Sequence, residues 1–139
     1  MQIDTSTEFG QRVARRLQEE RIIWLITTGP DGTPQPRPVW FWWDGESFLI
    51  YSQPDTFKLT HIQSNPNVAL NLDGDGLGGD IIVFTSLARL DPAAPPADQS
   101  PEYAAKYQSG FERIGMTAAE FAAAYSVALR VTPAALRGH

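Results

Sequence analysis

The stretch that decides the fold is residues 24–76, WLITTGPDGTPQPRPVWFWWDGESFLIYSQPDTFKLTHIQSNPNVALNLDGDG. Short runs of β-branched and aromatic residues alternate in it with the turn sequences Gly-Pro-Asp-Gly and Asp-Gly, which is typical of consecutive β-strands. A short helix at Thr56–Ser64 interrupts the strands, and the Asn-Pro pair after it stops the helix. We therefore expect strands at Arg21–Thr28, Pro36–Asp44, Ser47–Ser52 and Val68–Leu72.

The flanking sequence predicts further helices and two more strands. Thr5–Glu8 has the pattern of a capping box, ahead of a helix in which Phe9, Val13 and Leu17 repeat every four residues. The other expected elements are a loop at Asp73–Gly79, a strand at Ile81–Leu90, a helix starting at Ser100-Pro101, an alanine-rich helix behind a second capping box at Thr117–Glu120, and a last strand at Val127–Val131. Six mostly antiparallel strands with few helices predict a mainly β (α+β) fold with flanking helices, closed into a small barrel.

Composition and charge argue against several classes of protein. The 139 residues suit one domain, 1–139, and 42% of them are hydrophobic, which is enough for a packed core. The net charge of −5 argues against nonspecific binding to nucleic acid, because phosphate affinity requires surplus Lys and Arg. The chain has no cysteine, and no His, Asp and Glu spacing matches a metal site. The N-terminal residues lack the apolar core of a signal peptide and no apolar run reaches membrane-spanning length, so we expect a cytoplasmic protein without a membrane partner.

The segment Pro34-Gln35-Pro36-Arg37-Pro38 is unusual for a strand. In extended chain the three prolines direct their backbone groups toward one edge, and that edge has no N–H to donate to a neighbouring strand. It is therefore either a free edge protected from aggregation or the rim of a groove. The residues that follow, Val39-Trp40-Phe41-Trp42-Trp43, offer flat apolar surface suited to a planar ring, although two or more of these aromatic residues must belong to the core or to a dimer interface.

Lys58 is the second unusual feature. It is the only Lys or Arg between Arg37 and Arg89, a window with six Asp or Glu. It falls in the first turn of the predicted helix, where the helix dipole disfavours a cation, and a bound anion such as phosphate would reverse that penalty. Neutral donors from neighbouring residues would complete such a site: Ser52, Gln53 and Thr56. The alternative interpretation is a solvated lysine paired with Asp55.

Four segments in this order and spacing resemble the pyridoxamine-5′-phosphate-oxidase-like split β-barrel family, in particular its actinobacterial F420-dependent oxidoreductase branch. The segments are Asp31-Gly32-Thr33-Pro34, Pro38-Val39-Trp40-Phe41, Ser52 to Lys58, and Asn65-Pro66-Asn67-Val68-Ala69-Leu70. The resemblance covers about Arg21 to Leu90. It implies a six-stranded antiparallel split β-barrel, FMN-binding-like, that forms a homodimer with the cofactor in a groove between the subunits.

The resemblance also implies which residues bind the cofactor. The ring would lie along Pro38, Val39, Trp40 and Phe41, largely against backbone, and Ser52, Gln53, Thr56 and Lys58 would hold its phosphate. Many relatives carry an Arg beside this lysine where this chain has Phe57, so fewer charges would hold the phosphate, and Arg37 would compensate from the preceding strand. The substrate pocket would come from Asp73–Gly79, Asp91–Tyr107 and the partner subunit.

Three functions follow as hypotheses. The first is an F420-dependent oxidoreductase that transfers hydride between the reduced deazaflavin and a small organic acceptor, with the cofactor supplying most of the chemistry. The second is an FMN-dependent oxidoreductase or FMN-binding protein of the same fold. The third is a barrel that binds a cofactor or haem-like ligand without turnover, or a purely structural dimer. The sequence identifies no catalytic acid or base, since His61 fits a surface or interface residue better.

Overall fold

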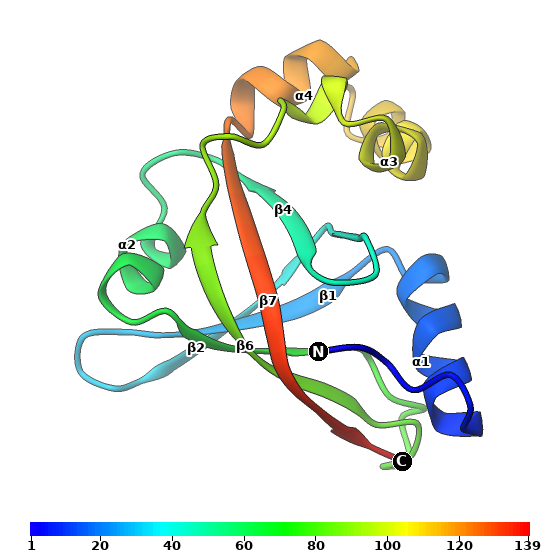
Figure 1. Ribbon diagram of the computed structural model, residues 1–139. Helices are drawn as coiled ribbons and strands as arrows, with labels where there is room; N and C mark the ends of the chain where they lie inside the picture. The colour runs from blue at the N-terminus through cyan, green and yellow to red at the C-terminus, as the bar shows by residue number, and fades with distance from the viewer.

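One antiparallel sheet of seven strands forms the body of the protein in the computed structural model, which describes residues 1–139 (Figure 1). The strands are β1 (Ile23–Thr28), β2 (Pro34–Val39), β3 (Trp42–Trp43), β4 (Phe48–Ser52), β5 (Asn67–Asn71), β6 (Ile82–Leu90) and β7 (Val127–Gly138). Their order across the sheet is β2-β1-β5-β6-β7-β4-β3. The sheet curls into a half-barrel, so the mainly β prediction with flanking helices is confirmed.

The prediction of six strands was wrong, because the expected strand Pro36–Asp44 is two strands, β2 and β3, which pair with different neighbours. The chain leaves the ladder at Trp40 and Phe41. The Phe41 N–H donates to the hydroxyl of Tyr107 at 2.8 Å, and the Phe41 carbonyl accepts from Lys106 Nζ at 3.0 Å. Side chains of a distant helix therefore replace the strand partner at this point, which no local pattern reveals.

The prediction of a closed barrel was also wrong, because the two outermost strands of the sheet, β2 and β3, do not pair with each other. They are nevertheless consecutive in the chain, and Trp40-Phe41 joins one edge of the sheet to the other. The two edges are therefore linked by the chain itself and not by a hydrogen-bonded ladder. As a result β2 keeps an unpaired edge.

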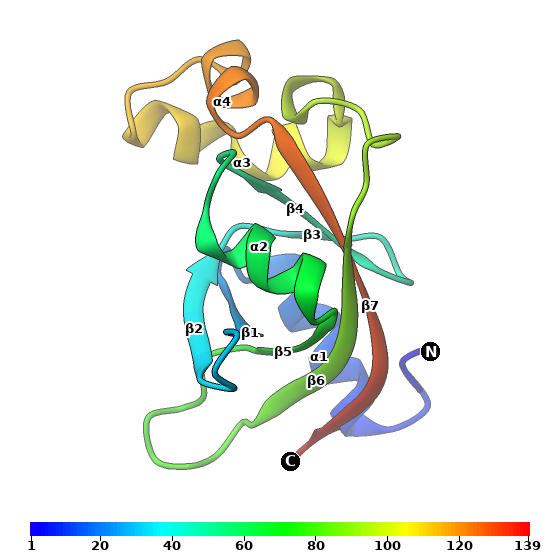
Figure 2. The same cartoon turned by 90° about the vertical axis from the view of Figure 1, so that its left-hand side faces the viewer.

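Four α-helices and one short 3₁₀ turn surround the sheet: α1 (Glu8–Glu19), α2 (Phe57–Ser64), η1 (Ala97–Gln99), α3 (Pro101–Arg113) and α4 (Ala118–Ala124). The α1 helix is capped by Thr7, whose hydroxyl accepts from the N–H of Gly10, and not by the predicted Thr5–Glu8 box. The box at Thr117 and Glu120 forms as predicted. In Figure 2, α2 lies across the open side of the sheet, while α3 and α4 form a separate layer at one end. No helix has the length and apolar character that crossing a bilayer requires, and a cytoplasmic location stays a prediction.

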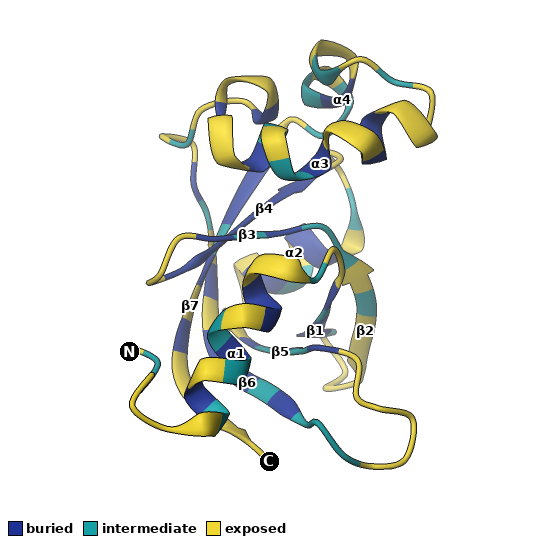
Figure 3. Cartoon of the chain, turned by 90° about the vertical axis from the view of Figure 1, so that its right-hand side faces the viewer, coloured by how far each residue is buried: buried dark blue, intermediate teal, exposed yellow.

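Two hydrophobic clusters fill the interior. The larger one lies inside the curl of the sheet, and the smaller one lies between the sheet and the layer of α3 and α4. All five residues of β4 are buried because its two faces serve the two clusters: Phe48 and Ile50 face the first, Leu49 and Tyr51 the second. Figure 3 shows that α3 buries the side toward the sheet and exposes the other. The strand β4 thus couples the helical layer to the barrel.

The last strand is longer than predicted. The sequence predicts a strand at Val127–Val131, but β7 continues past Pro133 to Gly138 and pairs with β6 from Leu129 onward. A register shift in this ladder lies between Thr85 and Ser86, with Pro133 opposite Ser86. Because a bulge tolerates a residue that cannot donate, the proline does not end the strand.

Candidate functional site

A pocket of about 420 Å³ opens where β2, the start of α2 and the layer of α3 and α4 meet. Its volume lies within the range of about 300–1,000 Å³ that is usual for small-molecule sites. Seven of the nine residues that the sequence predicted for a cofactor lie together on its wall: Arg37, Pro38, Val39, Trp40, Gln53, Thr56 and Lys58. The other two, Phe41 and Ser52, do not line it.

The pocket runs along the open edge of β2. Four consecutive residues, Arg37 to Trp40, line the pocket. Successive side chains of a strand point to opposite faces of the sheet, so what these four residues present in common to the pocket is their backbone edge. Pro34, Pro36 and Pro38 are paired in register with β1 residues but have no backbone N–H to donate. The N–H groups that β2 donates to β1 therefore come from the residues between the prolines. The first N–H after Pro38 on this edge is that of Trp40, and it has no protein acceptor. The two sequence interpretations therefore coincide, since this free edge is also the rim of the pocket.

Lys58 and Arg37 make this wall cationic. Lys58 is buried, with 8% of its surface exposed, and its Nζ lies 3.4 Å from the Thr56 hydroxyl. Neither cation has a carboxylate within 4 Å, so the alternative of a solvated Lys58 paired with Asp55 is wrong. Burial, and secondarily the charge of Arg37, lower the pKa of Lys58. The buried Arg37 Nε also has no hydrogen-bond partner. Two cations without counterions provide a place for an anionic group.

The uncharged polar residues near Lys58 differ in whether their side chains are free to bind a ligand. Ser52 is buried, and its hydroxyl already donates to the Gln53 carbonyl at 2.8 Å. Thr56 is the N-cap residue of α2, but its side chain makes no capping hydrogen bond. The N–H groups of Phe57 and Lys58 are thus left open, while that of Leu59 donates to the Thr56 carbonyl at 3.2 Å. Open N–H groups at a helix start favour the binding of an anion. Gln53 and Thr56 therefore line the pocket, whereas Ser52 supports the turn behind it.

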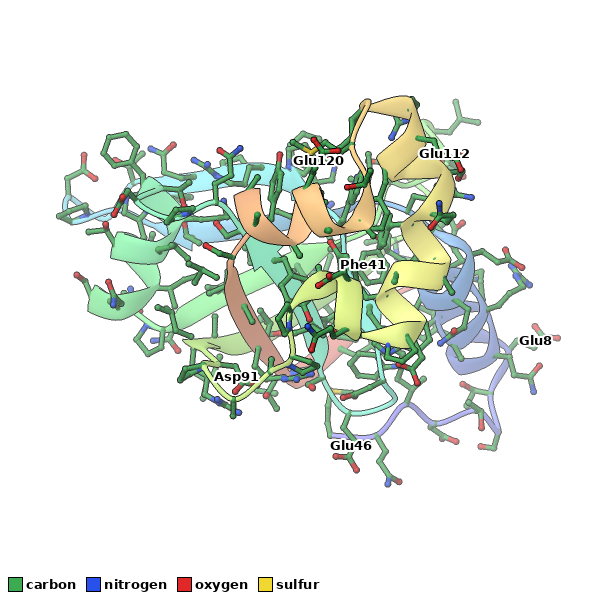
Figure 4. All side chains as sticks on the ribbon, turned by 90° about the horizontal axis from the view of Figure 1, so that it is seen from above. Glu8, Phe41, Glu46, Asp91, Glu112 and Glu120 are labelled. Carbon is green, nitrogen blue, oxygen red and sulfur yellow. The ribbon has the colours of Figure 1, made fainter.

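Phe41 has a structural position. Its side chain is fully buried in the larger cluster, and Figure 4 shows it beneath the helical layer, while Glu8, Glu46, Glu112 and Glu120 lie at the periphery. Lys106 Nζ lies 3.6 Å from the centre of its ring. A cofactor in the pocket would therefore meet Trp40 and not the side chain of Phe41.

Sequence reasoning missed the other end of the pocket, which is aromatic and apolar. It is lined by Tyr51, Tyr103, Ile114, Phe121 and Tyr125, all but Tyr51 carried by α3, α4 and their ends. The spacing of Tyr103, Tyr107 and Phe111 signals a buried helix face but not a pocket. The loop Asp73–Gly79, expected near the substrate, does not line this pocket. The expected segment Asp91–Tyr107 contributes one wall residue, Tyr103.

The lowered pKa of Lys106 predicts that the stability of the protein depends on pH. Burial of Lys106, and secondarily Arg21, lower this pKa from 10.5 to about 8. The unfolded chain keeps the proton up to about 10.5, so between these values it binds more protons than the native state, and stability rises with pH. In urea unfolding at pH 7.5 and 9.5, we expect wild type to gain free energy of unfolding relative to Lys106→Met. An equal change in both proteins would contradict the assignment.

The fold and the pocket define a mainly β half-barrel protein with a ligand-sized, partly cationic pocket at an open strand edge. The sequence matches the pyridoxamine 5′-phosphate oxidase family model over residues 9–139, and the chain belongs to this family. The resemblance seen in the sequence is thereby confirmed at the level of the family. No match was found among curated proteins.

Three solved structures illustrate the range of similar proteins. An F420 reductase is 26% identical, with a TM-score of 0.63 over 88% of this chain and 94% of its own. A FAD-binding protein from Mesorhizobium loti is 15% identical, with a TM-score of 0.65 over 91% and 88%. The heme storage protein HutZ from Vibrio cholerae is 14% identical, with a TM-score of 0.64 over 99% and 95%. The likeness to the two structures of lower sequence identity shows the fold alone.

Proposed function

We propose that the chain is an F420-dependent oxidoreductase that transfers hydride between the reduced deazaflavin and a small organic acceptor. The observation that supports this most is the pair of cations, Lys58 and Arg37, on the wall of a pocket beside an open strand edge, with no carboxylate within 4 Å. An anionic tail fits the cations, and a planar ring fits the edge. The similar F420 reductase makes this cofactor the first choice.

The residues of the chain would bind and orient this cofactor. Lys58, Arg37 and the open N–H groups at the start of α2 would hold its phosphate, with Gln53 and Thr56 adding neutral hydrogen bonds. The backbone edge at Pro38 and Trp40 would face the ring, with proline carbonyls as acceptors and the Trp40 N–H as a donor. When bound, the deazaflavin supplies the hydride chemistry. The layer of α3 and α4 would exclude water from the ring.

The test of this proposal is a comparison of ligands. We expect purified protein, titrated with F420, FMN and haemin, to bind F420 most tightly, because its ring and phosphate match the edge and the cations. A clear preference for FMN would favour an FMN-dependent oxidoreductase or FMN-binding protein. A preference for haemin would favour a binding protein without turnover. Either result would overturn the F420 assignment.

We also propose a homodimer that pairs through the outer face of β1, β5 and β6. A groove on this face is lined by uncharged residues, among them Ile26, Ala69 and Leu87, and Leu87 is 52% exposed. An uncharged face of this kind is typical of an interface between copies.

The dimer gives a second prediction. Leu87→Arg is expected to halve the molar mass measured by light scattering, because it buries a charge in the interface. Leu77→Arg is the control, since Leu77 is 92% exposed and lies outside the groove. A mass unaffected by Leu87→Arg, or a monomeric wild type, would contradict this interface.

A further inference from the structure

A second pocket, of about 410 Å³, lies between the start of β1 and α3. Trp40 is the one residue that lines both this pocket and the pocket beside β2. We call the second one the arginine pocket, because Arg21 and Arg113 lie on its wall together with Ile22 and residues of α3. No acidic residue lines it, and its volume suits a small molecule.

The two arginines of this pocket have no counterion in the protein. Five of the eleven Lys and Arg side chains pair with a carboxylate within 4 Å, and Arg21 and Arg113 are not among them. Their acidic neighbours in the chain are bonded elsewhere: Glu20 pairs with Arg16 at 2.8 Å, and Glu112 accepts from another residue of α3 at 3.3 Å. In a chain with a net charge of −5, two unpaired cations on one pocket wall favour an anion from solution.

Arg21 is held in a position from which it can bind such an anion. Its Nη1 donates to the Lys106 carbonyl at 3.2 Å and to the Ser109 hydroxyl at 3.4 Å, which ties the guanidinium to α3 and leaves its other N–H groups free. The backbone N–H of Ile22 also has no acceptor in the protein. Arg113 adds a second guanidinium from the last turn of α3. Guanidinium groups match the geometry of carboxylate and phosphate oxygens.

The rest of the wall offers apolar surface and space. Ile22 is 43% exposed, and the edge of the Trp40 indole lies against Gly110. A Cβ at residue 110 would lie 3.0 Å from this indole, so a side chain there would press on Trp40 and take up space in the pocket. The glycine therefore leaves room for the apolar body of a ligand beside the arginines.

We propose that the arginine pocket binds an organic anion, with its carboxylate or phosphate group on Arg21 and Arg113 and a flat apolar body against Ile22 and Trp40. This site is separate from the cofactor site proposed above, and its test does not require that cofactor. A carboxylic acid and a phosphate ester offer the same anionic oxygens, so the probes are chosen to distinguish the two.

The test titrates the full chain, by isothermal calorimetry, with 2-naphthoate, 2-naphthyl phosphate, uncharged 2-naphthol and inorganic phosphate. We expect a naphthyl anion to bind about 10-fold or more tightly than 2-naphthol and inorganic phosphate, because it alone engages both the arginines and the apolar wall. The tighter of the two naphthyl anions identifies the anionic group. Equally tight binding of 2-naphthol would refute the role of the arginines, and equally tight binding of inorganic phosphate would show an adventitious ion only.

Variants locate the probe in the protein. Arg113→Met is expected to weaken binding of the tighter naphthyl anion about 10- to 100-fold, as loss of a charged hydrogen bond predicts. Arg137→Met is the matched control, since Arg137 is also exposed and without a carboxylate but lies outside the pocket. Lys58→Met should bind the probe as wild type does. Loss of binding in Lys58→Met but not in Arg113→Met would place the probe beside β2, which overturns this inference and leaves the cofactor proposal untouched.

A second readout uses the proton of Lys106. The charged groups that act on it are Arg21, which with the larger effect of burial lowers the pKa of Lys106 to about 8, and Glu20, which opposes this shift. The neighbouring Tyr107 stays protonated, because burial raises its pKa. An anion on Arg21 would offset the arginine charge and raise the pKa of Lys106.

We therefore expect wild type to take up protons when the naphthyl anion binds at pH 8, and Lys106→Met to bind it without this uptake. Titrations in two buffers that differ in ionisation enthalpy measure the number of protons. Binding to wild type without proton uptake, or the same uptake in Lys106→Met, would place the anion away from Arg21 and overturn the site.

Discussion

Lys58→Met is expected to weaken binding of F420 about 10- to 100-fold, as loss of a charged hydrogen bond of about 1.5–3 kcal/mol predicts. Methionine keeps an apolar chain of similar length, so the packing around the buried stem of Lys58 changes little. Without ligand the same variant should be more stable than wild type, because it removes a buried cation that has no counterion. Titration with F420 and urea unfolding of the free protein check the two effects.

The matched control is Lys106→Met, which removes another lysine whose pKa burial lowers but which does not line the pocket. It should bind F420 as wild type does. Equal affinity of wild type and Lys58→Met would show that Lys58 does not hold the cofactor, and a loss of stability in Lys58→Met would show that the cation is satisfied in the free protein.

Tyr107→Phe is expected to destabilise the protein by about 2–3 kcal/mol. Its hydroxyl accepts from the Phe41 N–H at 2.8 Å and lies 2.7 Å from the Arg21 carbonyl and 3.0 Å from that of Phe41. Phenylalanine leaves the buried N–H of Phe41 without a partner, which costs about 1–3 kcal/mol, and the donated bond is lost as well. Urea unfolding measures the free-energy difference.

The comparison for this prediction is Tyr125→Phe, which removes a half-buried hydroxyl for which no hydrogen bond is found. We expect its free energy of unfolding to stay within about 0.5 kcal/mol of wild type. If Tyr107→Phe were as harmless, the junction between β2 and β3 would not depend on the Tyr107 hydroxyl.

Several features of the site are already visible in the sequence. The alternate prolines of residues 34–38 predict an edge without donors, and β2 is an edge strand. Lys58 stands out by its isolation among acidic residues at a helix start, and it is buried on the pocket wall. The edge could be predicted because proline geometry acts within a few residues, whereas the binding of an anion by Lys58 stays a prediction from helix-start electrostatics. Phe41 and Ser52 show the limit, since neighbours of wall residues on the chain need not lie on the wall.

Local pattern was thus enough for the turns, for most strands and for the edge that borders the pocket, because these depend on backbone chemistry over a few residues. Only tertiary packing decided three other features: the break between β2 and β3, the burial of Lys58 away from Asp55, and the aromatic wall supplied by α3 and α4. Each of them depends on contacts between residues far apart in the chain, such as Phe41 with Tyr107. Such contacts depend on how the elements pack, which no single segment encodes.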